Sequence, residues 1–245
     1  MNIDGGVLQS FENINVQKNE TINQELTGLI AFKKSLKYIK YINSFFKRIM
    51  DIVGAIVGII LLIPLIIVVK IINLVNKDNG PLFYTHERIG LNGKHFRMYK
   101  FRSMCMNSQE VLEKILKEDE DARKEWEEHR KLSNDPRITK IGKILRKTSL
   151  DEFPQFLNVL KGEMSLVGPR AVIDGEIEKF GLFKDAVLSV KPGITGYWAA
   201  NGRSETSYEE RVEMEFYYVS KNSIFMDIGI IFKTIISVIK KEGAV

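Results

Sequence analysis

The chain has 245 residues, a formal net charge of +5 and 44% hydrophobic residues, which is enough for one large domain or for a domain with a membrane anchor. Its single cysteine, Cys105, excludes an intrachain disulfide framework and suits a reducing compartment. The modest positive charge fits an anionic membrane surface, a nucleic acid or a phosphorylated substrate without choosing among them.

The N-terminal part divides into two segments. Residues 1–28 are polar and lack the basic and then apolar pattern of a signal peptide, so we expect a polar tail with no assigned function. Over residues 29–45, apolar side chains recur at spacings of three and four, with lysines between them. This pattern predicts a basic amphipathic helix, which either lies on a membrane surface or packs against a partner or a core.

A long apolar segment follows, within residues 46–76. Ile52–Val69 contains 18 residues without a charged or hydrogen-bonding side chain. As a helix it would be about 27 Å long, close to the roughly 30 Å of a bilayer's hydrocarbon layer. Pro64 lacks the N–H that would bond to Ile60, and it predicts a kink at this membrane break. Basic residues flank both ends, so a spanning helix and a kinked helix that returns to the same face are both open.

Residues 77–245 are predicted to form an α+β domain. Pro81–Tyr84 and His95–Arg102 alternate apolar and polar residues, and the turn sequence Gly90–Gly93 between them indicates a small β-hairpin. The sequence of Lys191–Trp198 predicts a turn followed by a short aromatic strand. We expect helices over residues 109–132, 138–147, 175–188 and 208–219, and an amphipathic, membrane-contacting helix over 224–239.

The most informative stretch is Leu145–Arg170, which contains the adjacent carboxylates Asp151 and Glu152. In one reading, Ser149 is a helix N-cap and Ser149-x-x-Glu152 is a capping box. Pro154 disfavours this reading, because proline is tolerated better in the first turn than at the fifth helical position. The alternative places the helix from about Pro154 to Gly162 and leaves both carboxylates in the preceding turn, where backbone N–H groups and nearby Arg146, Lys147 and Arg170 would attract phosphate.

This stretch also carries a resemblance. The run TSLDEFPQ at 148–155, followed by LNVLKGEMSLVGPR at 157–170, resembles the signature of the bacterial sugar transferase family, the monotopic polyprenyl-phosphate phosphoglycosyl transferases. The segments YKFRSM at 99–104, KPGITGYW at 191–198 and Asn201-Gly202-Arg203 resemble further motifs of that family. The resemblance extends from about Phe46 to the C-terminus, and Ala199-Ala200 departs from its pattern.

The resemblance implies transfer of a hexose 1-phosphate, galactose or glucose, from a UDP-sugar to undecaprenyl phosphate, with release of UMP. Asp151 would be the nucleophile that forms an aspartyl-phosphosugar intermediate, and Glu152 would hold Mg²⁺. Phosphate and substrate contacts would come from basic side chains at Lys100, Arg102, Arg146, Arg170 and Arg203.

The resemblance also implies a location and a pathway. The catalytic domain would lie on the cytoplasmic face of the bacterial inner membrane, because a UDP-sugar is cytoplasmic. Both flanks of the apolar segment would then be cytoplasmic, which selects a kinked re-entrant helix with Pro64 at its break. The reaction would be the first membrane step of capsule, exopolysaccharide or O-antigen assembly, with downstream glycosyltransferases as partners.

Two other function classes compete with an enzyme. An inactive membrane-surface scaffold could recruit assembly enzymes through its basic helices, although a scaffold has no need of Asp151, Glu152, Arg146 and Arg170 together. A nucleic-acid binder is disfavoured by the apolar segment and by the lack of a helix-turn-helix or zinc-ligand spacing. The sequence does not indicate an oligomeric state.

Overall fold

The computed structural model describes residues 42–129, 132–202 and 206–240. The chain divides into two compact units, residues 1–47 and 48–245, and most described residues belong to the second. The predicted polar tail and residues 29–41 of the predicted basic helix lie outside the described residues.

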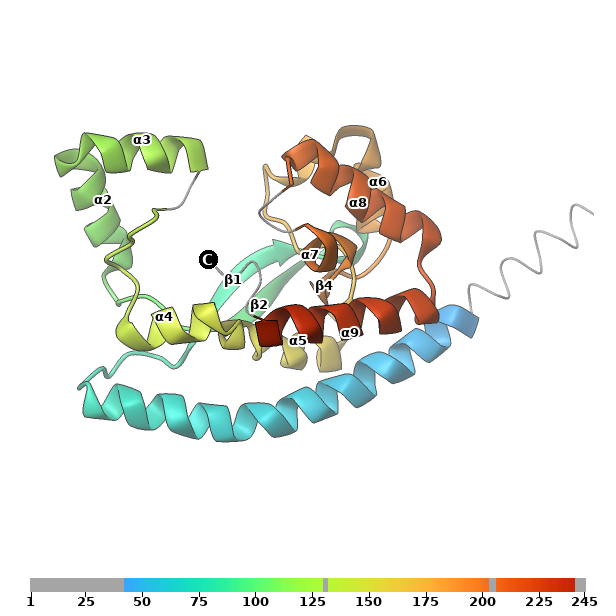
Figure 1. The fold of residues 1–245 in the computed structure, drawn as a ribbon, viewed down its shortest axis with the longest axis horizontal. Coiled ribbons are helices and arrows are strands. Elements are labelled where there is room, and N and C mark those ends of the chain that lie inside the picture. The colour runs from blue at the N-terminus through green and yellow to red at the C-terminus, as the bar shows by residue number, and fades with distance from the viewer. Residues whose placement is uncertain (1–41, 130–131, 203–205, 241–245) are drawn as a thin grey trace, which may run out of the picture. The chain divides into compact units, whose positions relative to one another are not determined.

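The apolar segment forms one helix, Ile42–Val75, whose 34 residues make it long and apolar enough to cross a membrane. The helical assignment continues through Pro64, and the ribbon bends gradually along its length (Figure 1). From Arg48 onward, one face of this helix is buried against the rest of the second unit. Its buried positions recur at helical spacing and are Asp51, Ala55, Gly58, Leu62, Val69 and Asn73.

Polar contacts and small residues fasten this helix to the domain. Asp51 is 2% exposed, and its Oδ1 accepts hydrogen bonds from Ser165 Oγ and Leu166 N, both at 2.8 Å. Gly54 and Gly58 lie so close to Leu166 and Phe156 that an added Cβ would come within 2.4 Å and 2.3 Å of those side chains. The helix therefore packs too closely for larger side chains at these two positions.

The predicted hairpin is confirmed. Strands β1 (Phe83–Ile89) and β2 (His95–Phe101) pair antiparallel, with Tyr84 opposite Lys100 and Arg88 opposite Phe96. The 3-10 turn η1 (Leu91–Gly93) joins them, and Asn92 adopts a left-handed φ of 55°. Because partners on one face alternate along a pleated pair, Tyr84, Arg88 and Lys100 share a face.

Three helices follow the hairpin. The charged stretch forms α2 (Ser108–Glu118) and α3 (Glu120–His129), separated at Asp119, where one helix was predicted. The short basic helix is α4 (Lys140–Lys147), and its N-cap Thr139 accepts a hydrogen bond from Gly142 N at 3.0 Å. Of the three, α4 ends directly before the segment that carries the carboxylates.

The remaining elements build the second half of the domain. Strands β3 (Ser165–Val167) and β4 (Gly193–Thr195) form a parallel pair. The aromatic strand prediction is wrong in its bounds, because β4 ends at Thr195 and Tyr197 and Trp198 begin a helix. The helical elements are η2 (Leu150–Glu152), α5 (Gln155–Lys161), η3 (Ile177–Phe183), α6 (Lys184–Leu188), α7 (Tyr197–Asn201), α8 (Tyr208–Lys221) and α9 (Ile224–Lys240).

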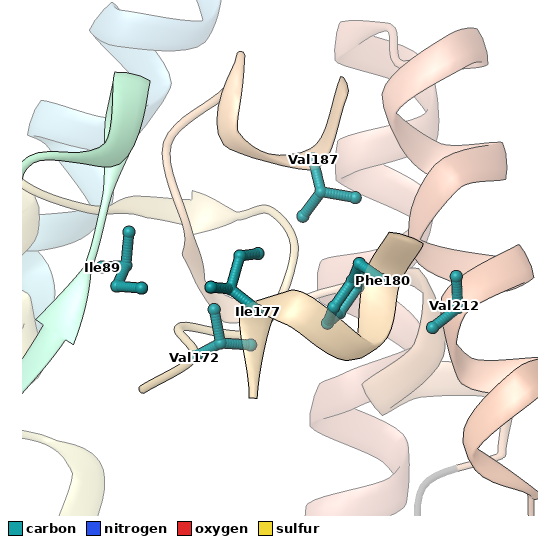
Figure 2. Packing of buried hydrophobic residues seen from close by; sticks show 6 residues of the cluster. All are labelled: Ile89, Val172, Ile177, Phe180, Val187 and Val212. Atoms are coloured by element: carbon teal, nitrogen blue, oxygen red, sulfur yellow. The ribbon is translucent and has the colours of Figure 1, made fainter. Parts of the chain in front are cut away.

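Several apolar clusters hold these elements together. One joins the hairpin end to η3, α6 and α8 through Ile89, Val172, Ile177, Phe180, Val187 and Val212, as Figure 2 shows. Another joins the long helix to the hairpin and α4 through Leu62, Val69, Phe101 and Leu145. The predicted α+β class, a mostly helical domain with a short hairpin, is therefore confirmed.

Candidate functional site

The two adjacent carboxylates lie in a turn of their own. Asp151 and Glu152 belong to the 3-10 turn η2, between α4 and α5. Ser149, directly before this turn, has a left-handed backbone (φ 56°, ψ 16°) and makes no side-chain cap hydrogen bond. The capping-box reading is therefore wrong, and a non-glycine residue in this uncommon conformation marks a locally constrained backbone.

The helix after the turn follows the second reading of the sequence. Helix α5 begins at Gln155 with Pro154 as its N-cap and ends before Gly162, whose φ is 83°. Arg48, on the long helix, donates from Nη1 to Val159 O at 2.8 Å and from Nη2 to Leu160 O at 2.9 Å. A cation at these last carbonyls is favourable, so Arg48 holds the C-terminal end of the helix that follows the carboxylates.

The two carboxylates differ in their partners. Glu152 Oε1 accepts a hydrogen bond from Lys100 Nζ at 2.6 Å, and both side chains are partly buried. Burial raises the pKa of Asp151 above its ordinary value, and the negative charge of Glu152 adds to this rise. Lys100 and Arg146 act in the opposite direction. The structure therefore brings Lys100 and Arg146 within electrostatic reach of the predicted nucleophile.

The other predicted phosphate ligands have varied surroundings. Arg146, in the last turn of α4, donates from Nε to Ser103 Oγ at 2.9 Å. Arg102 donates to Asp78 Oδ1, Pro81 O and Met104 O, so its guanidinium fastens the chain entering the hairpin. The Arg102 hydrogen bond lowers the pKa of Asp78. A substrate contact by Arg102 stays a prediction, and Arg203 lies outside the described residues.

Arg170 follows β3 at the Gly-Pro-Arg corner. Its backbone N–H donates to Glu215 Oε1 at 2.9 Å, and its Cζ lies 5.9 Å from the centroid of the Trp198 ring. One groove of about 1530 Å³ is lined by Asp151 and Glu152 and by Lys100, Arg102, Arg146 and Arg170. The structure therefore brings all the predicted site residues that it describes, apart from Pro64, to one groove.

The groove also has an apolar wall. The long helix contributes Gly54, Val57, Gly58 and Leu61, and α9 contributes Ile231, Ile235 and Val238. A charged end and an apolar wall in one groove suit a ligand with a phosphate head and a hydrocarbon tail.

The carboxylates of the groove are the donors available for the predicted Mg²⁺ ion. Among the described residues, no group of three or more His, Cys, Asp and Glu side chains is arranged to hold a metal ion. Magnesium is commonly held by one or two carboxylates together with substrate phosphates, and Asp151 and Glu152 supply two adjacent carboxylates. The donor set therefore fits Mg²⁺ bound with a phosphorylated substrate, and does not fit a closed protein cage.

Three residues of this region were not nominated from the sequence. Arg88 lies on the Lys100 face of the hairpin, and Arg211 and Glu215 lie on the buried face of α8. Glu215 is 1% exposed, and burial raises its pKa from 4.5 to about 7. Tyr84 pairs with Lys100, and Arg88 is an even number of residues away from Tyr84 on the same strand. The sequence could therefore have placed Arg88 on the face that carries Lys100. No local signal marks Arg211 or Glu215.

Comparisons with known proteins agree with these observations. The model of the family described as bacterial sugar transferase matches residues 42–241. A UDP-galactose-lipid carrier transferase of Erwinia amylovora is 50% identical over 216 residues, which cover 88% of this chain and 45% of that protein.

Two further relatives match a shorter part of this chain. An undecaprenyl-phosphate galactose phosphotransferase of Salmonella typhimurium is 51% identical over 168 residues, covering 69% of this chain and 35% of that protein. The exopolysaccharide production protein ExoY of Rhizobium meliloti is 47% identical over 167 residues, covering 68% of this chain and 74% of that protein. The chain thus spans less than half the length of the Erwinia and Salmonella relatives.

Proposed function

This chain belongs to the bacterial sugar transferase family, and from that premise we propose that it transfers a hexose 1-phosphate from a UDP-sugar to undecaprenyl phosphate and releases UMP. The observation that carries this proposal is the pair Asp151 and Glu152 in a groove that combines basic side chains with an apolar wall. Galactose is the preferred hexose in the proposal, and glucose is the alternative, because two relatives are named for galactose or its UDP derivative.

The proposed reaction has two displacement steps at one phosphorus atom. A carboxylate oxygen of Asp151 attacks the phosphorus that bears the sugar, and the bond from this phosphorus to the bridging oxygen of the diphosphate breaks. UMP leaves with that oxygen. A phosphate oxygen of undecaprenyl phosphate then attacks the same phosphorus, the acyl-phosphate bond breaks, and the Asp151 carboxylate is regenerated.

The contacts of the two carboxylates support these different roles. Lys100 is hydrogen-bonded to Glu152, which leaves Asp151 as the carboxylate available to attack. Arg146 and Lys100 stabilise the charged form of Asp151 against the effect of burial. Arginine at Arg146 and Arg170 suits two-pronged contacts with phosphate oxygens, and Arg102 and Arg203 remain further candidates for such contacts.

Mg²⁺ bound at Glu152 would neutralise diphosphate charge during the transfer. Such binding would also weaken the repulsion that Glu152 exerts on Asp151. Glu152 would share its charge between Lys100 and the ion.

We also propose that the long helix stays on the membrane side where the domain lies. Its buried face follows the domain from Asp51 to Asn73, a length of roughly 33 Å for a helix at 1.5 Å per residue. A straight span across the bilayer would carry this attached domain into the hydrocarbon layer. The opposite face exposes large apolar side chains, among them Val53, Ile60 and Ile67, which suits contact with lipid.

This placement supports the cytoplasmic face of the inner membrane as the location, with Pro64 at the bend of a re-entrant helix. The product would enter capsule, exopolysaccharide or O-antigen assembly, where downstream glycosyltransferases would extend it.

The decisive experiment is a UMP-release screen of the full chain in membranes. UDP-galactose, UDP-glucose and UDP-N-acetylhexosamines would each be offered with undecaprenyl phosphate, and the Asp151→Asn variant would be the matched control. We expect acceptor-dependent UMP release with one UDP-hexose. A wild-type protein that releases no UMP with any donor would favour a membrane-surface scaffold.

A further inference from the structure

A second group of cationic side chains lies beside the carboxylate pair. Arg211 is 8% exposed, and its Nη1 donates to Glu176 Oε1 at 2.8 Å. Its Nε and Nη2 are buried without a hydrogen-bond partner among the described residues. Two unpartnered donors on one buried guanidinium are costly, so this side chain has capacity for an acceptor that a ligand would supply.

Arg88, on the hairpin, also has a buried guanidinium donor without a hydrogen-bond partner among the described residues. Its Nη2 contacts His86 Nδ1 at 3.2 Å, while its Nε is buried and without a partner in the described parts of the chain. Burial lowers the pKa of Arg88, and the positive charge of Arg170 lowers it further. Like charges gathered in a partly buried region repel each other unless an anion joins them.

The surrounding charges leave an excess of positive charge. Arg88, Lys100 and Arg170 line a small pocket with Glu152, Trp198 and Glu215, and Arg211 lies over the Trp198 ring with its Cζ 4.7 Å from the ring centroid. Glu152 and Glu176 already form ion pairs, with Lys100 and Arg211 respectively. Glu215 is the third carboxylate, and its Oε2 is buried and unpartnered among the described residues.

This pocket lies on the Glu152 side of the carboxylate pair. Its lining residues include Glu152 but neither Asp151 nor Arg146. The larger groove is lined by Asp151 and Arg146 and shares Arg88, Lys100, Glu152 and Arg170 with this pocket, so it connects the two regions. The phosphorus attacked by Asp151 and a group bound by Arg88 and Arg211 would accordingly occupy different parts of one groove.

We propose that Arg88, Arg170 and Arg211 form a second phosphate subsite, which holds the phosphate that is not attacked by Asp151. This inference rests on the proposed function and adds the residues that bind the other phosphate group. Two substrates could supply such a phosphate: the nucleotide that leaves and the lipid that accepts the sugar phosphate. We expect the nucleotide, because the unpartnered Glu215 Oε2 beside the arginines could accept a hydrogen bond from a ribose hydroxyl.

The test measures binding separately from turnover. The full chain in lipid nanodiscs would be titrated with UMP and, in a second arm, with farnesyl phosphate as a short lipid phosphate. The variants are Arg88→Gln and Arg211→Gln. The matched control is Arg97→Gln, which removes the same charge from an exposed position of β2.

We expect each subsite variant to raise the dissociation constant of UMP at least about tenfold, as for the loss of one charge-assisted contact, and the control to leave it unchanged. A weakening restricted to farnesyl phosphate would keep the subsite and assign it to the acceptor. If Arg211→Gln fails to fold, Arg211→Lys retains the charge but loses the two-pronged donor, and it should weaken binding to a smaller extent.

The inference is overturned if UMP and farnesyl phosphate both bind Arg88→Gln and Arg211→Gln as tightly as the wild type, or if the wild type binds neither. Failure of the proposed function looks different. In that case the wild type would release no UMP from any UDP-sugar, whatever its affinity for these two probes.

Discussion

Asp151 and Glu152 are neighbours in one turn but have different environments. Glu152 is engaged by Lys100, whereas the pKa of Asp151 is raised by burial and by Glu152 and lowered by Lys100 and Arg146. This asymmetry supports the proposed attack by Asp151 and the proposed cation binding by Glu152. Substitutions that remove a single charge without changing shape can test the two roles separately.

Asp151→Asn should lower acceptor-dependent UMP release at least about a thousandfold while leaving the thermal unfolding temperature near the wild-type value. The amide has nearly the same shape but cannot form the acyl-phosphate. A radiolabelled sugar phosphate that stays attached to wild-type protein after denaturation, and is absent from the variant, would report the intermediate. Wild-type-like UMP release by Asp151→Asn would show that another group attacks.

Glu152→Gln should raise the Mg²⁺ concentration required for half-maximal activity roughly tenfold or more, because an amide oxygen is a weaker ligand for a hard cation. The measurement is a Mg²⁺ titration of UMP release at saturating donor. Exposed Glu113 in α2 offers a control, Glu113→Gln. Identical Mg²⁺ dependence in Glu152→Gln and wild type would remove Glu152 from the metal site.

Glu215 should make stability depend on pH. Its pKa is raised from 4.5 to about 7 in the folded chain, so the folded state keeps a proton that the unfolded state releases between these values. The contribution of protonated Glu215 to the stability of the folded state is therefore fully present below pH 4.5 and is lost as the pH rises through about 7. The shift corresponds to a loss on the order of 3 kcal/mol.

Glu215→Gln should not show this loss. Thermal unfolding of both proteins would be measured from pH 4.5 to 8. As the pH rises to about 7, the wild type should lose stability relative to the variant, and above that pH the difference should stay constant. Parallel pH profiles for the two proteins would mean that Glu215 titrates at an ordinary pKa.

At the level of elements, the long helix is an integral part of the domain. It supplies Arg48 to the end of α5, Asp51 to β3, and Gly54 and Gly58 to close contacts with Leu166 and Phe156. These contacts reach the segment that follows the carboxylates. The helix therefore acts both as an apolar surface and as a support for the site.

Asp51→Ala should destabilise the domain by about 3 kcal/mol. It leaves the buried Ser165 Oγ and the partly buried Leu166 N without the acceptor that they share. For a domain of this size the unfolding temperature should fall by roughly 6–12 °C in detergent solution. Asp121→Ala, at an exposed position of α3, is the control and should change it little. An equal effect of both substitutions would mean that the Asp51 contacts contribute no particular stability.

For the whole molecule, the proposed function requires the groove to open toward a membrane surface. The groove has walls from the long helix and α9 and a charged end at the carboxylates. A lipid phosphate could reach Asp151 from a bilayer that contacts the exposed apolar face of the long helix. This arrangement requires both ends of the helix on the membrane side that holds the nucleotide sugar.

We therefore expect residues 47 and 77 on the same, cytoplasmic side. Single cysteines at Ile30 and Asn79, in a Cys105→Ser background, would be exposed to a membrane-impermeant thiol reagent in intact cells. Asn79 is preferable to Asp78, because Asp78 binds Arg102. Neither site should react until the cells are permeabilised, and reaction of either in intact cells would favour a spanning anchor.

Pro64→Leu provides the complementary change. It restores the missing backbone donor and should straighten the helix. A straight apolar helix of 18 residues is long enough to cross, so some molecules should expose one site to the outside and activity should fall. Labelling and activity that match the unmodified background would show that Pro64 does not determine the topology.

The sequence determined the features that depend on local signals. Alternation predicted the hairpin, and the proline and glycine predicted the bounds of α5 to within about a residue, leaving Asp151 and Glu152 in the preceding turn. These two predictions succeeded because turn residues and strand alternation act over a few neighbouring positions. The family resemblance was confirmed by the match over residues 42–241.

Tertiary structure alone decided which distant side chains meet. Arg211 and Glu215 are one helical turn apart, a spacing that predicts an exposed ion pair. Packing against η3 and the Arg170 corner instead buries both side chains. Arg102 lies in a family-like motif but is held by Asp78, and Asp227 of α9 accepts a buried hydrogen bond from Tyr218. The physical reason is that burial of a polar group depends on partners far along the chain, which local periodicity does not encode.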